Sequence, residues 1–323
     1  MPEPRVQRLA YEVTAAAPAG VLYGLIADTT QWPLYLPPAV HVEQLEFDGV
    51  RERLRMFACA QGRITSWTSV RTLDPARRRV DFRQEAPTAP LAAMGGTWTV
   101  WPLDAAHCRV RLVHDLELNG PAPWVEQATE ANSRAQLASL ARLAERWGRL
   151  DEAVLTFEDT VRVHGPAELV YDFLYRVRDW PQLLPQVGRV QVREQTPGVQ
   201  QVQVLTRDQA AGRAPGDWHG AVRSVRICFP HAGRIVHKQT SALPLVESHV
   251  GEWVLEPDEH GVLARARHSV VLGEDHLERE LGPGADLAAA RAAVRAALGK
   301  DSTTVLDLAK QYAESAVPVV WPR

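Results

Sequence analysis

The chain begins with a short run of alternating apolar and polar residues, and a stretch with helical spacing follows it. Residues 5–14 alternate in the manner of a β-strand. Apolar residues then recur at helical spacing from Pro18 to Ala27. Trp32-Pro33 and the prolines after it cannot continue a helix, so the pattern predicts that the helix ends there.

Six further runs have the alternation of strands, at residues 40–47, 51–59, 63–73, 78–85, 94–103 and 107–118. Turn signals such as Asp48-Gly49 separate some of them, which predicts an antiparallel meander. Residues 124–147 then predict one long helix. Because an antiparallel sheet needs one covered face, we expect an α+β fold in which a curved sheet wraps around this helix.

The same order of elements begins again at residue 151, with a strand at 152–163 and a helix at 167–177. Equivalent residues keep their spacing: Pro18 precedes Trp32 by 14 residues, as Pro166 precedes Trp180, and Arg71 precedes Trp98 by 27, as Arg226 precedes Trp253. The large differences are insertions, a Gly/Ala-rich piece near 208–217 and an Ala/Arg-rich piece near 284–299. Self-similarity over half the chain predicts two copies of one fold, residues 1–150 and 151–323.

Composition narrows the possible classes of function. The 323 residues are 46% hydrophobic with a net charge of −3, which gives no reason to expect nucleic acid or an anionic membrane as a partner. Three scattered cysteines suggest neither a disulfide framework nor a metal site, and a reducing cytoplasm fits them. The first residues lack the apolar core of a signal peptide, and we find no apolar run of about 18 residues, the length needed to span a membrane.

One of the predicted strands carries a set of side chains that would be unusual in a packed hydrophobic core. Alternation places Trp67, Ser69 and Arg71 on the same face. Burying an unpaired charge is costly, so this set favours a wet cavity. The simpler interpretation is a solvated edge arginine or a surface ion pair. The second copy repeats Ser224 and Arg226 at the same spacing, which strengthens the functional interpretation.

Other residues recur in both copies, with packing as the simpler interpretation. Trp32 and Trp180 each follow a helix and precede proline, as lids or packing plugs would. Trp98 and Trp253 fit either packing or the lining of a cavity, and His114 and His268 are by default hydrogen-bonded fillers. We find no nucleotide-binding glycine motif, no nucleophile elbow and no His/Cys/Asp spacing typical of a metal site, so we expect neither a cofactor nor a metal.

Taken as a set, the motifs resemble the aromatase/cyclases of bacterial type II polyketide synthases, members of the helix-grip (START, Bet v 1-like) superfamily. The resemblance covers nearly the whole chain as a tandem, like the didomain aromatase/cyclases. The stretches that carry it are Asp28 to Pro33, Trp67 to Arg71, Met94 to Trp98, Asp179 to Pro181, Ser224 to Arg226 and His249 to Trp253. The family implies two helix-grip domains, each with an internal cavity between sheet and long helix.

The resemblance also implies site residues. Arg71 and Arg226 match the strand arginine most tied to activity in single-domain members, and Ser69 and Ser224 match the serine beside it. With His114, at the position of a polar pocket residue, they are the expected catalytic set. We expect the substrate to be bound by Trp32, Tyr35, Trp67, Arg83, Met94, Trp98, Trp180, Lys238, His249, Trp253 and His268.

The second copy departs from the pattern at two positions. Leu183 stands where the first copy has Tyr35, and Val222 stands where it has Trp67. Its pocket is therefore expected to be more aliphatic, and the first copy is expected to be chemically richer.

The implied substrate is a poly-β-ketone on an acyl carrier protein, made by a minimal polyketide synthase and reduced at C9 by a ketoreductase. Ring closure develops negative charge on an enolate oxygen, for which a protonated arginine is an electrostatic anchor and not a base. His114 or a bound water would then move protons. We hypothesise aromatisation of the first ring. Two alternatives stay open: a non-catalytic carrier of a hydrophobic ligand, and a scaffold that only docks other synthase components.

Overall fold

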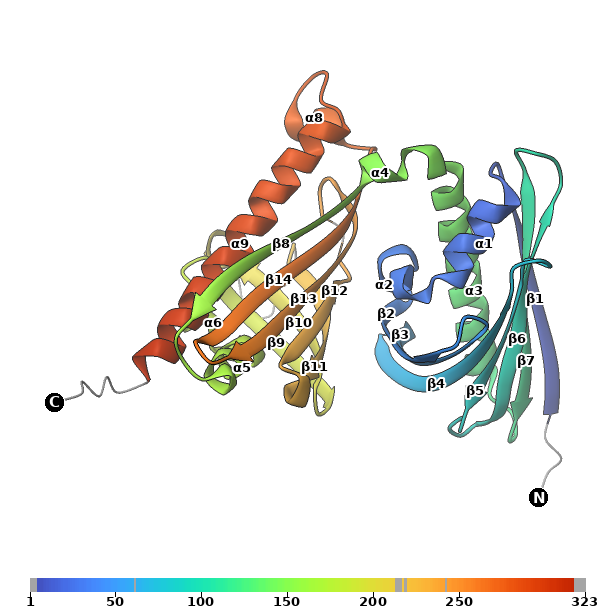
Figure 1. Ribbon diagram of the computed structural model, residues 1–323, viewed down its shortest axis with the longest axis horizontal. Helices are drawn as coiled ribbons and strands as arrows, with labels where there is room; N and C mark the ends of the chain where they lie inside the picture. The colour runs from blue at the N-terminus through green and yellow to red at the C-terminus, as the bar shows by residue number, and fades with distance from the viewer. Residues whose placement is uncertain (1–4, 61, 213–216, 218–219, 242, 317–323) are drawn as a thin grey trace. The chain divides into compact units, whose positions relative to one another are not determined.

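The computed structural model describes residues 5–60, 62–212, 217, 220–241 and 243–316 (Figure 1). The chain divides into two compact units, Met1–Leu150 and Asp151–Arg323, which we call the first and the second domain. No helix in the described ranges combines the length and the apolar character needed to cross a membrane.

The first domain follows the expected order of a strand, a helix, six strands and a long helix. Its main elements are β1 (Arg5–Ala15), α1 (Ala19–Ala27), β2 (Ala39–Phe47), β3 (Arg51–Ala60), β4 (Arg63–Asp74), β5 (Arg79–Glu85), β6 (Leu91–Pro102), β7 (Cys108–Leu118) and α3 (Pro123–Glu145). Short helical turns complete it: η1 (Thr29–Gln31), α2 (Trp32–Tyr35) and η2 (Trp147–Arg149). The one-turn helix α4 (Leu150–Ala153) spans the boundary between the two units.

The sequence predicted that helical structure ends at Trp32-Pro33, but it continues there. Trp32 begins the one-turn helix α2, with Pro33 in its first turn. That position suits proline because the backbone N–H groups of a first turn have no intrahelical acceptor.

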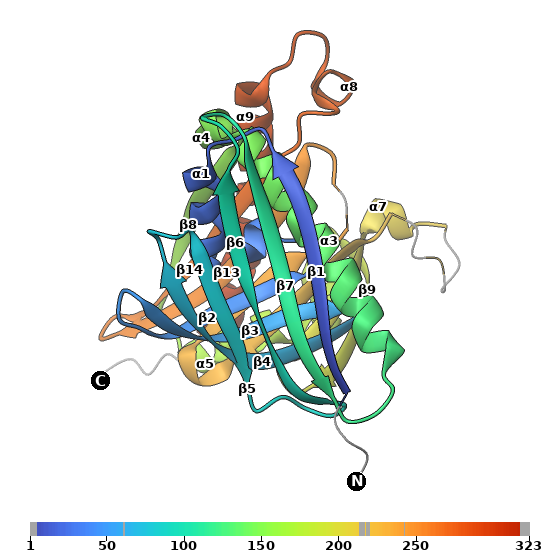
Figure 2. The ribbon, with the colours of Figure 1, turned by 90° about the vertical axis from the view of Figure 1, so that its right-hand side faces the viewer.

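The seven strands of the first domain form one open antiparallel sheet in the order β1-β7-β6-β5-β4-β3-β2. In Figure 2, β2, β3 and β4 run across the direction of β6, β7 and β1, which shows how strongly the sheet curves. Helix α3 packs against β1 and α1 on the concave side. This is the predicted helix-grip arrangement.

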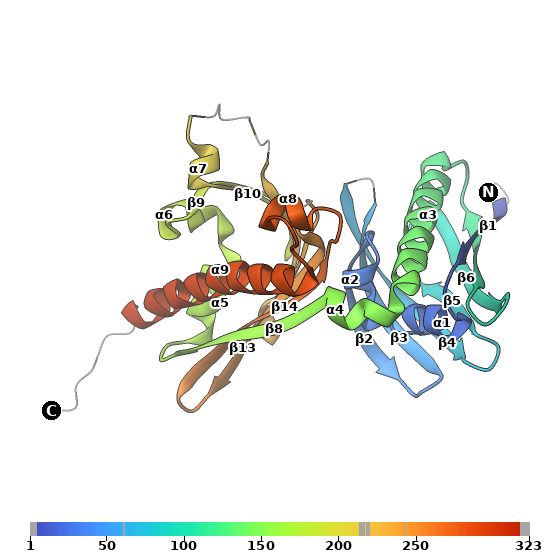
Figure 3. The same cartoon turned by 90° about the horizontal axis from the view of Figure 1, so that it is seen from above.

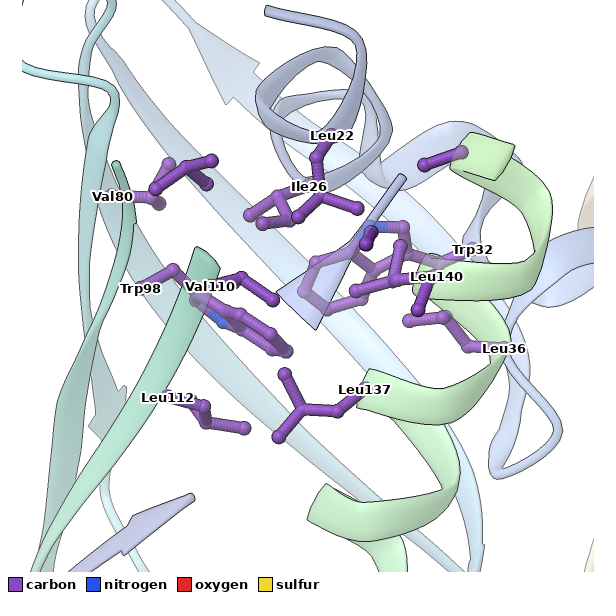
Figure 4. Close-up of a cluster of buried hydrophobic side chains, with 14 of the residues drawn as sticks. Leu22, Ile26, Trp32, Leu36, Val80, Trp98, Val110, Leu112, Leu137 and Leu140 are labelled. Carbon is purple, nitrogen blue, oxygen red and sulfur yellow. The ribbon is translucent and has the colours of Figure 1, made fainter. Parts of the chain in front are cut away.

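The core fills the space between the concave face of the sheet and the two helices (Figure 4). Leu22 and Ile26 enter it from α1, and Leu137 and Leu140 enter it from α3. Trp98 of β6 meets them from the sheet and is 3% exposed. Burying side chains of this size stabilises a fold by about 1.5–3 kcal/mol each. The helices are therefore held on the sheet by packing.

The second domain repeats the architecture, with the strand order β8-β14-β13-β12-β11-β10-β9. Its strands are β8 (Val154–Val163), β9 (Val187–Thr196), β10 (Val199–Thr206), β11 (Val222–Phe229), β12 (Arg234–Gln239), β13 (Val246–Asp258) and β14 (Gly261–Leu272). Its helices are α5 (Ala167–Tyr175), η3 (Val177–Asp179), α6 (Trp180–Leu183), α7 (Arg207–Ala210), η4 (Pro230–Ala232), α8 (Leu277–Leu281) and α9 (Leu287–Ser315). Figure 3 shows α9 lying along β8, as α3 lies on β1.

The two inserted pieces have different structures. Part of the Gly/Ala-rich piece forms α7, and its residues 213–216 lie outside the described residues. Most of the Ala/Arg-rich piece forms the first half of α9, which has 29 residues against 23 in α3. Alanine favours helix, and the side chain of Asp286 caps the first turn by accepting from the backbone N–H of Ala289 at 2.9 Å. The insertion therefore lengthens the long helix.

One glycine in the Met94 to Trp98 motif is required by close packing across the sheet. Gly96 pairs with Phe82 on β5 and with His114 on β7. A Cβ atom built at Gly96 would lie 2.0 Å from the backbone oxygen of Val113 and 2.6 Å from the ring of Phe82. The ring of Phe82 thus occupies space that only glycine leaves free. Gly251 is the equivalent residue in the second domain, where His237 takes the place of Phe82.

This packing predicts opposite effects for two glycine-to-alanine substitutions. Gly96→Ala should destabilise the first domain by about 1–3 kcal/mol, the usual cost of overpacking. Gly24→Ala, within α1 and with nothing within 4 Å of its added Cβ, should stabilise the domain by about 0.5–1 kcal/mol. Urea denaturation followed by circular dichroism measures both. Equal effects of the two substitutions would contradict this account of Gly96.

Candidate active site

A cavity of about 280 Å³ opens between the sheet and α3 in the first domain. Aromatic and apolar side chains make most of its wall, among them Trp32, Met56, Trp67, Phe82, Met94 and Trp98. Polar side chains share the wall, among them Ser69, Arg71, Gln84, His114, Asn132, Ser133 and Gln136. Such a surface suits an extended, mostly apolar ligand that carries several oxygen atoms.

The side chains that alternation places on one face of strand β4 line the cavity. Trp67, Ser69 and Arg71 all line the cavity from one face of this strand. The hydroxyl of Ser69 donates to the backbone oxygen of Arg83 at 3.1 Å, so a ligand meets only its lone pairs. Trp32, Met94, Trp98 and His114 also line the cavity, as the sequence predicts.

Arg71 is buried and held on several sides, with 2% of its surface exposed. Its Nη2 donates to the backbone oxygen of Ile26 at the end of α1, at 2.7 Å. Its guanidinium carbon lies 5.0 Å from the ring centre of Trp32. Burial lowers the pKa of Arg71 to about 10, so the side chain stays protonated near neutral pH. The arginine therefore ties the sheet to the end of α1.

Glu52 is the partner that the sequence analysis missed. It pairs with Arg71 across β3 and β4, its Oε1 lies 2.7 Å from Nη1 of Arg71, and its side chain is 2% exposed. The two atoms are close without the alignment of a hydrogen bond, and Nε of Arg71 has no hydrogen-bond partner among the described residues. Contrary to the simple picture of an unpaired anchor, the charge of Arg71 is balanced. Its Nε–H is left to donate.

Arg226 occupies the same place in the second domain with a different partner. Its Nη2 donates to the backbone oxygen of Leu174 at 2.6 Å, and its Nη1 donates to Oε1 of Gln200 at 3.0 Å. Gln200 pairs with Arg226 as Glu52 pairs with Arg71. Burial lowers the pKa of Arg226. The second domain therefore keeps the link but satisfies it with a neutral amide.

His114 has one defined tautomer. The hydroxyl of Ser133 donates to the backbone oxygen of Thr129 at 2.6 Å, so it can only accept from the imidazole, whose Nε2 lies 3.0 Å away. Nδ1 then carries a lone pair, and it is buried without a hydrogen-bond partner among the described residues. Burial lowers the pKa of His114 to about 4. A neutral imidazole with an unused acceptor nitrogen thus lies in the cavity wall.

Two predicted substrate-binding residues are not part of this wall. Arg83 is exposed, because its neighbours Phe82 and Gln84 point into the cavity and alternation turns Arg83 to the other face of β5. Tyr35 is half-buried on α2 and packs against the hydrophobic core. The prediction that they line the cavity is wrong for both.

The predicted residues of the second domain fall into two groups. Trp180 is half-buried beside Arg226, with its ring centre 5.8 Å from the guanidinium carbon, and Ser224 is half-buried on β11. Lys238 is 5% exposed and faces away from its neighbour His237, because adjacent strand residues point to opposite faces. The other group surrounds His237 and consists of Trp253, His249 and His268.

The fold brings three imidazoles together where the sequence showed no metal-ligand spacing. One ligand nitrogen from each of His237, His249 and His268 lies within 4.8 Å of the other two. Burial lowers the pKa of His249 to about 3 and that of His268 to about 4, and it lowers the pKa of His237 well below its usual value. The three histidines come from three strands, so no local motif reveals the cluster, and the sequence analysis did not find it.

Three comparisons with known proteins agree with this architecture. The model of the family described as "polyketide cyclase / dehydrase and lipid transport" matches residues 6–145 and again residues 154–314. The granaticin polyketide synthase bifunctional cyclase/dehydratase of Streptomyces violaceoruber is 37% identical over 320 residues, 98% of this chain and 97% of that protein. The actinorhodin polyketide synthase bifunctional cyclase/dehydratase of Streptomyces coelicolor is 38% identical over 315 residues, 95% and 96% of the two chains.

A solved structure shares the complete two-domain fold. The crystal structure of the di-domain ARO/CYC BexL from the BE-7585A biosynthetic pathway superposes with a TM-score of 0.83 and 40% identity. The match covers 97% of this chain and 100% of that one.

The buried ion pair predicts a ranked effect of two substitutions at one position. Glu52→Leu leaves Arg71 as an uncompensated buried charge and should destabilise the first domain by about 3–5 kcal/mol. Glu52→Gln should cost clearly less, because an amide oxygen can accept from the arginine as Gln200 does in the second domain. Urea denaturation measures both. Glu85→Gln, which weakens a more exposed pair with Arg53 on the same sheet, is the control and should cost less than about 1 kcal/mol. Equal losses for both Glu52 variants would contradict the proposed pairing.

The lowered pKa of His114 predicts a dependence of stability on pH. The unfolded chain binds a proton near pH 6.5 and the folded chain only near pH 4, so stability is complete above pH 6.5 and falls as the pH drops towards 4. This residue should account for about 2 kcal/mol of the stability lost between pH 7 and pH 5. His114→Asn removes the titration, so its unfolding free energy should change less over that range. Parallel curves for the two proteins would refute the assignment.

Proposed function

The chain belongs to the polyketide cyclase/dehydrase and lipid transport family, and from this premise we propose that it is a polyketide cyclase/dehydratase whose reaction takes place in the first-domain cavity. The names of its full-length relatives support the class of reaction. The observation that carries the assignment to this cavity is the tautomer of His114, which leaves a nitrogen lone pair without a hydrogen-bond partner on a residue of the cavity wall.

His114 is proposed as the group that moves protons. Nδ1 takes a proton from a methylene between two carbonyls of the poly-β-ketone, and the resulting enolate carbon attacks a ketone carbon further along the chain. The imidazolium returns the proton to the new alkoxide, which becomes a hydroxyl. A pKa of about 4 is low for a base near neutral pH. Negative charge developing on the bound enolate raises it where the proton is needed.

Aromatisation then requires only the loss of water. A second proton leaves a ring carbon, the hydroxyl on the neighbouring carbon departs after protonation, and a carbon–carbon double bond remains. No electron enters or leaves in these steps, so cyclisation with dehydration consumes no redox cofactor. A hydroxyl left by ketoreduction at C9 departs in the same way, which is why a C9-reduced chain is the proposed substrate and the first ring the proposed product.

Arg71 is proposed to orient a substrate oxygen, and Ser69, whose proton is donated to the backbone oxygen of Arg83, can accept only from a substrate hydroxyl. Since Glu52 balances the charge of Arg71, the N–H groups on Nε and Nη1, which have no hydrogen-bond partner among the described residues, are its remaining donors toward a developing enolate oxygen. A preorganised donor of this kind is worth roughly 3 kcal/mol in the transition state. Arg226 has a positioning role in the second domain, because Leu174 and Gln200 occupy its terminal nitrogens. Ser224, which lies on the same strand, is assigned no catalytic role.

The proposed partners follow from the substrate. A poly-β-ketone is reactive and is delivered on an acyl carrier protein, with the minimal polyketide synthase and a ketoreductase acting first. Trp124 lines the cavity and is 54% exposed, which makes it a suitable contact at the entrance for the arriving chain.

Reconstitution with a minimal polyketide synthase and a ketoreductase tests the proposal. His114→Asn should lower the rate at which the product with an aromatic first ring forms by roughly 10²–10⁴-fold, the usual contribution of a general acid–base group. Mass spectrometry should show shunt products in its place. Arg83→Ala, on the outer face of the neighbouring strand, is the matched control and should leave the products unchanged.

Binding separates an enzyme from a carrier. His114→Asn should still bind an aromatic polyketide analogue within a few-fold of wild type, measured by quenching of tryptophan fluorescence, while its turnover is lost. Full turnover by His114→Asn would refute the role of the histidine. If the complete protein gives the same products as a reaction without it, the cyclase proposal fails and the carrier function takes its place.

A further inference from the structure

The three imidazoles of the second domain lie on neighbouring strands at matched positions. His237 on β12 pairs with Gly251 on β13, and Gly251 pairs with His268 on β14. His249 lies two residues before Gly251 and therefore on the same face of β13. The four positions form one compact patch on the inner face of the sheet.

Gly251 makes room for the cluster. A Cβ atom built there would lie 2.3 Å from Cε1 and 2.4 Å from Nε2 of His237. The ring of His237 thus folds over the glycine, toward the other two histidines, with its centre 5.5 Å from the ring of His249 and 6.4 Å from that of His268. Any larger residue at position 251 would push the imidazole away.

The hydrogen bonds within the cluster leave nitrogen lone pairs that could bind a metal ion. Nε2 of His249 lies 3.0 Å from Nδ1 of His268, so one proton is shared between two nitrogens that could each carry a lone pair. Oε1 of Gln239 lies 3.4 Å from Nδ1 of His249, where it favours the tautomer with the lone pair on Nε2. Nε2 of His268 is buried and has no hydrogen-bond partner among the described residues. A buried nitrogen without a partner calls for an explanation, and a bound ion is one that fits an imidazole lone pair.

We propose that His237, His249 and His268 form a three-histidine site for a divalent transition metal ion, with Zn²⁺ as the expected occupant. Neutral imidazoles suit Zn²⁺, and three protein ligands leave a fourth position for water or for an oxygen of a bound ligand. Zn–N distances of about 2.1 Å in a tetrahedral site place the nitrogens about 3.4 Å apart, so closure needs shifts of about 1 Å from the present spacing. Gln239 would then orient His249 from outside the ligand set.

Nearby charges determine how tightly the cluster is expected to bind a metal ion. Besides burial, the positive charge of Arg226 lowers the pKa of His237, and that of Arg295 lowers the pKa of His268. Both oppose a dication, although Asp159 pairs with Arg295 and offsets part of its effect. Phe157 lies between this pair and the cluster, with its ring stacked 4.8 Å from His268 and the guanidinium of Arg295 on it at 4.2 Å. We therefore expect a metal that exchanges with chelators.

The first domain supplies an internal control for this inference. Its residues at the equivalent positions are Phe82, Met94 and His114, as the pairing with Gly96 shows. The same backbone therefore accommodates a phenylalanine and a methionine in place of two of the histidines. The proposed site goes beyond the cyclisation chemistry assigned to the first domain and does not depend on it.

The double substitution His237→Phe/His249→Met transplants the first-domain residues and tests the site. After removal of metals with a chelator, the full chain is titrated with Zn²⁺ by isothermal calorimetry and with Co²⁺ by visible absorption, which reports tetrahedral coordination. Wild type should bind one more ion per chain than the double variant. It should also show an increase of its melting temperature with Zn²⁺ that the variant lacks.

A second variant keeps the test decisive if the double one folds poorly, as judged by circular dichroism. His268→Gln should lower Zn²⁺ affinity by at least 10-fold and abolish the Co²⁺ absorption bands. His107→Gln, an exposed histidine of the first domain, controls for adventitious imidazole binding and should change neither. Equal stoichiometry for wild type and a folded cluster variant would overturn the proposal.

Discussion

A buried arginine that links a sheet strand to the end of the first helix is the constraint on which each domain depends. A guanidinium that is about 2–4% exposed is costly unless its N–H groups are satisfied. In the first domain a helix-terminal carbonyl accepts from Arg71 and Glu52 balances its charge, and in the second a carbonyl and Gln200 accept from Arg226. The tryptophan after the helix lies beside the guanidinium in both domains. The position of the helix, and with it one wall of the space under the sheet, follows from this link.

The parts that the sequence predicted correctly are those governed by local pattern. Alternation along residues 63–73 was enough to place Trp67, Ser69 and Arg71 on one face, and the repeated spacing was enough to find two copies of one fold. Arg83 shows the limit of the method. Arg83 precedes Trp98 by 15 residues, as Lys238 precedes Trp253, but a shared position in two repeats does not say which face of the strand a residue occupies.

Residues that contact each other across neighbouring strands could not be predicted from the sequence, for a physical reason. Glu52 and Arg71 meet only through the register of β3 and β4, and sequence distance carries no information about that register. His237 was missed in the same way, because its partners lie on two other strands and its counterpart in the first domain is Phe82. A useful signal existed in the Gly96 and Gly251 motifs, since a repeated glycine inside a strand marks a close approach of another group. The pattern did not say which group it was.

The two domains show how one backbone can support different chemistry. In the first, Arg71 and Glu52 together add no net charge to the cavity, so in the proposed reaction aimed N–H groups and the imidazolium formed with the enolate stabilise it. In the second, Gln200 leaves the charge of Arg226 unbalanced, and the nearest imidazole is kept neutral. The proposed base and the proposed metal ligands thus occupy equivalent strand positions. The difference follows from a glutamate exchanged for a glutamine and two apolar residues exchanged for histidines.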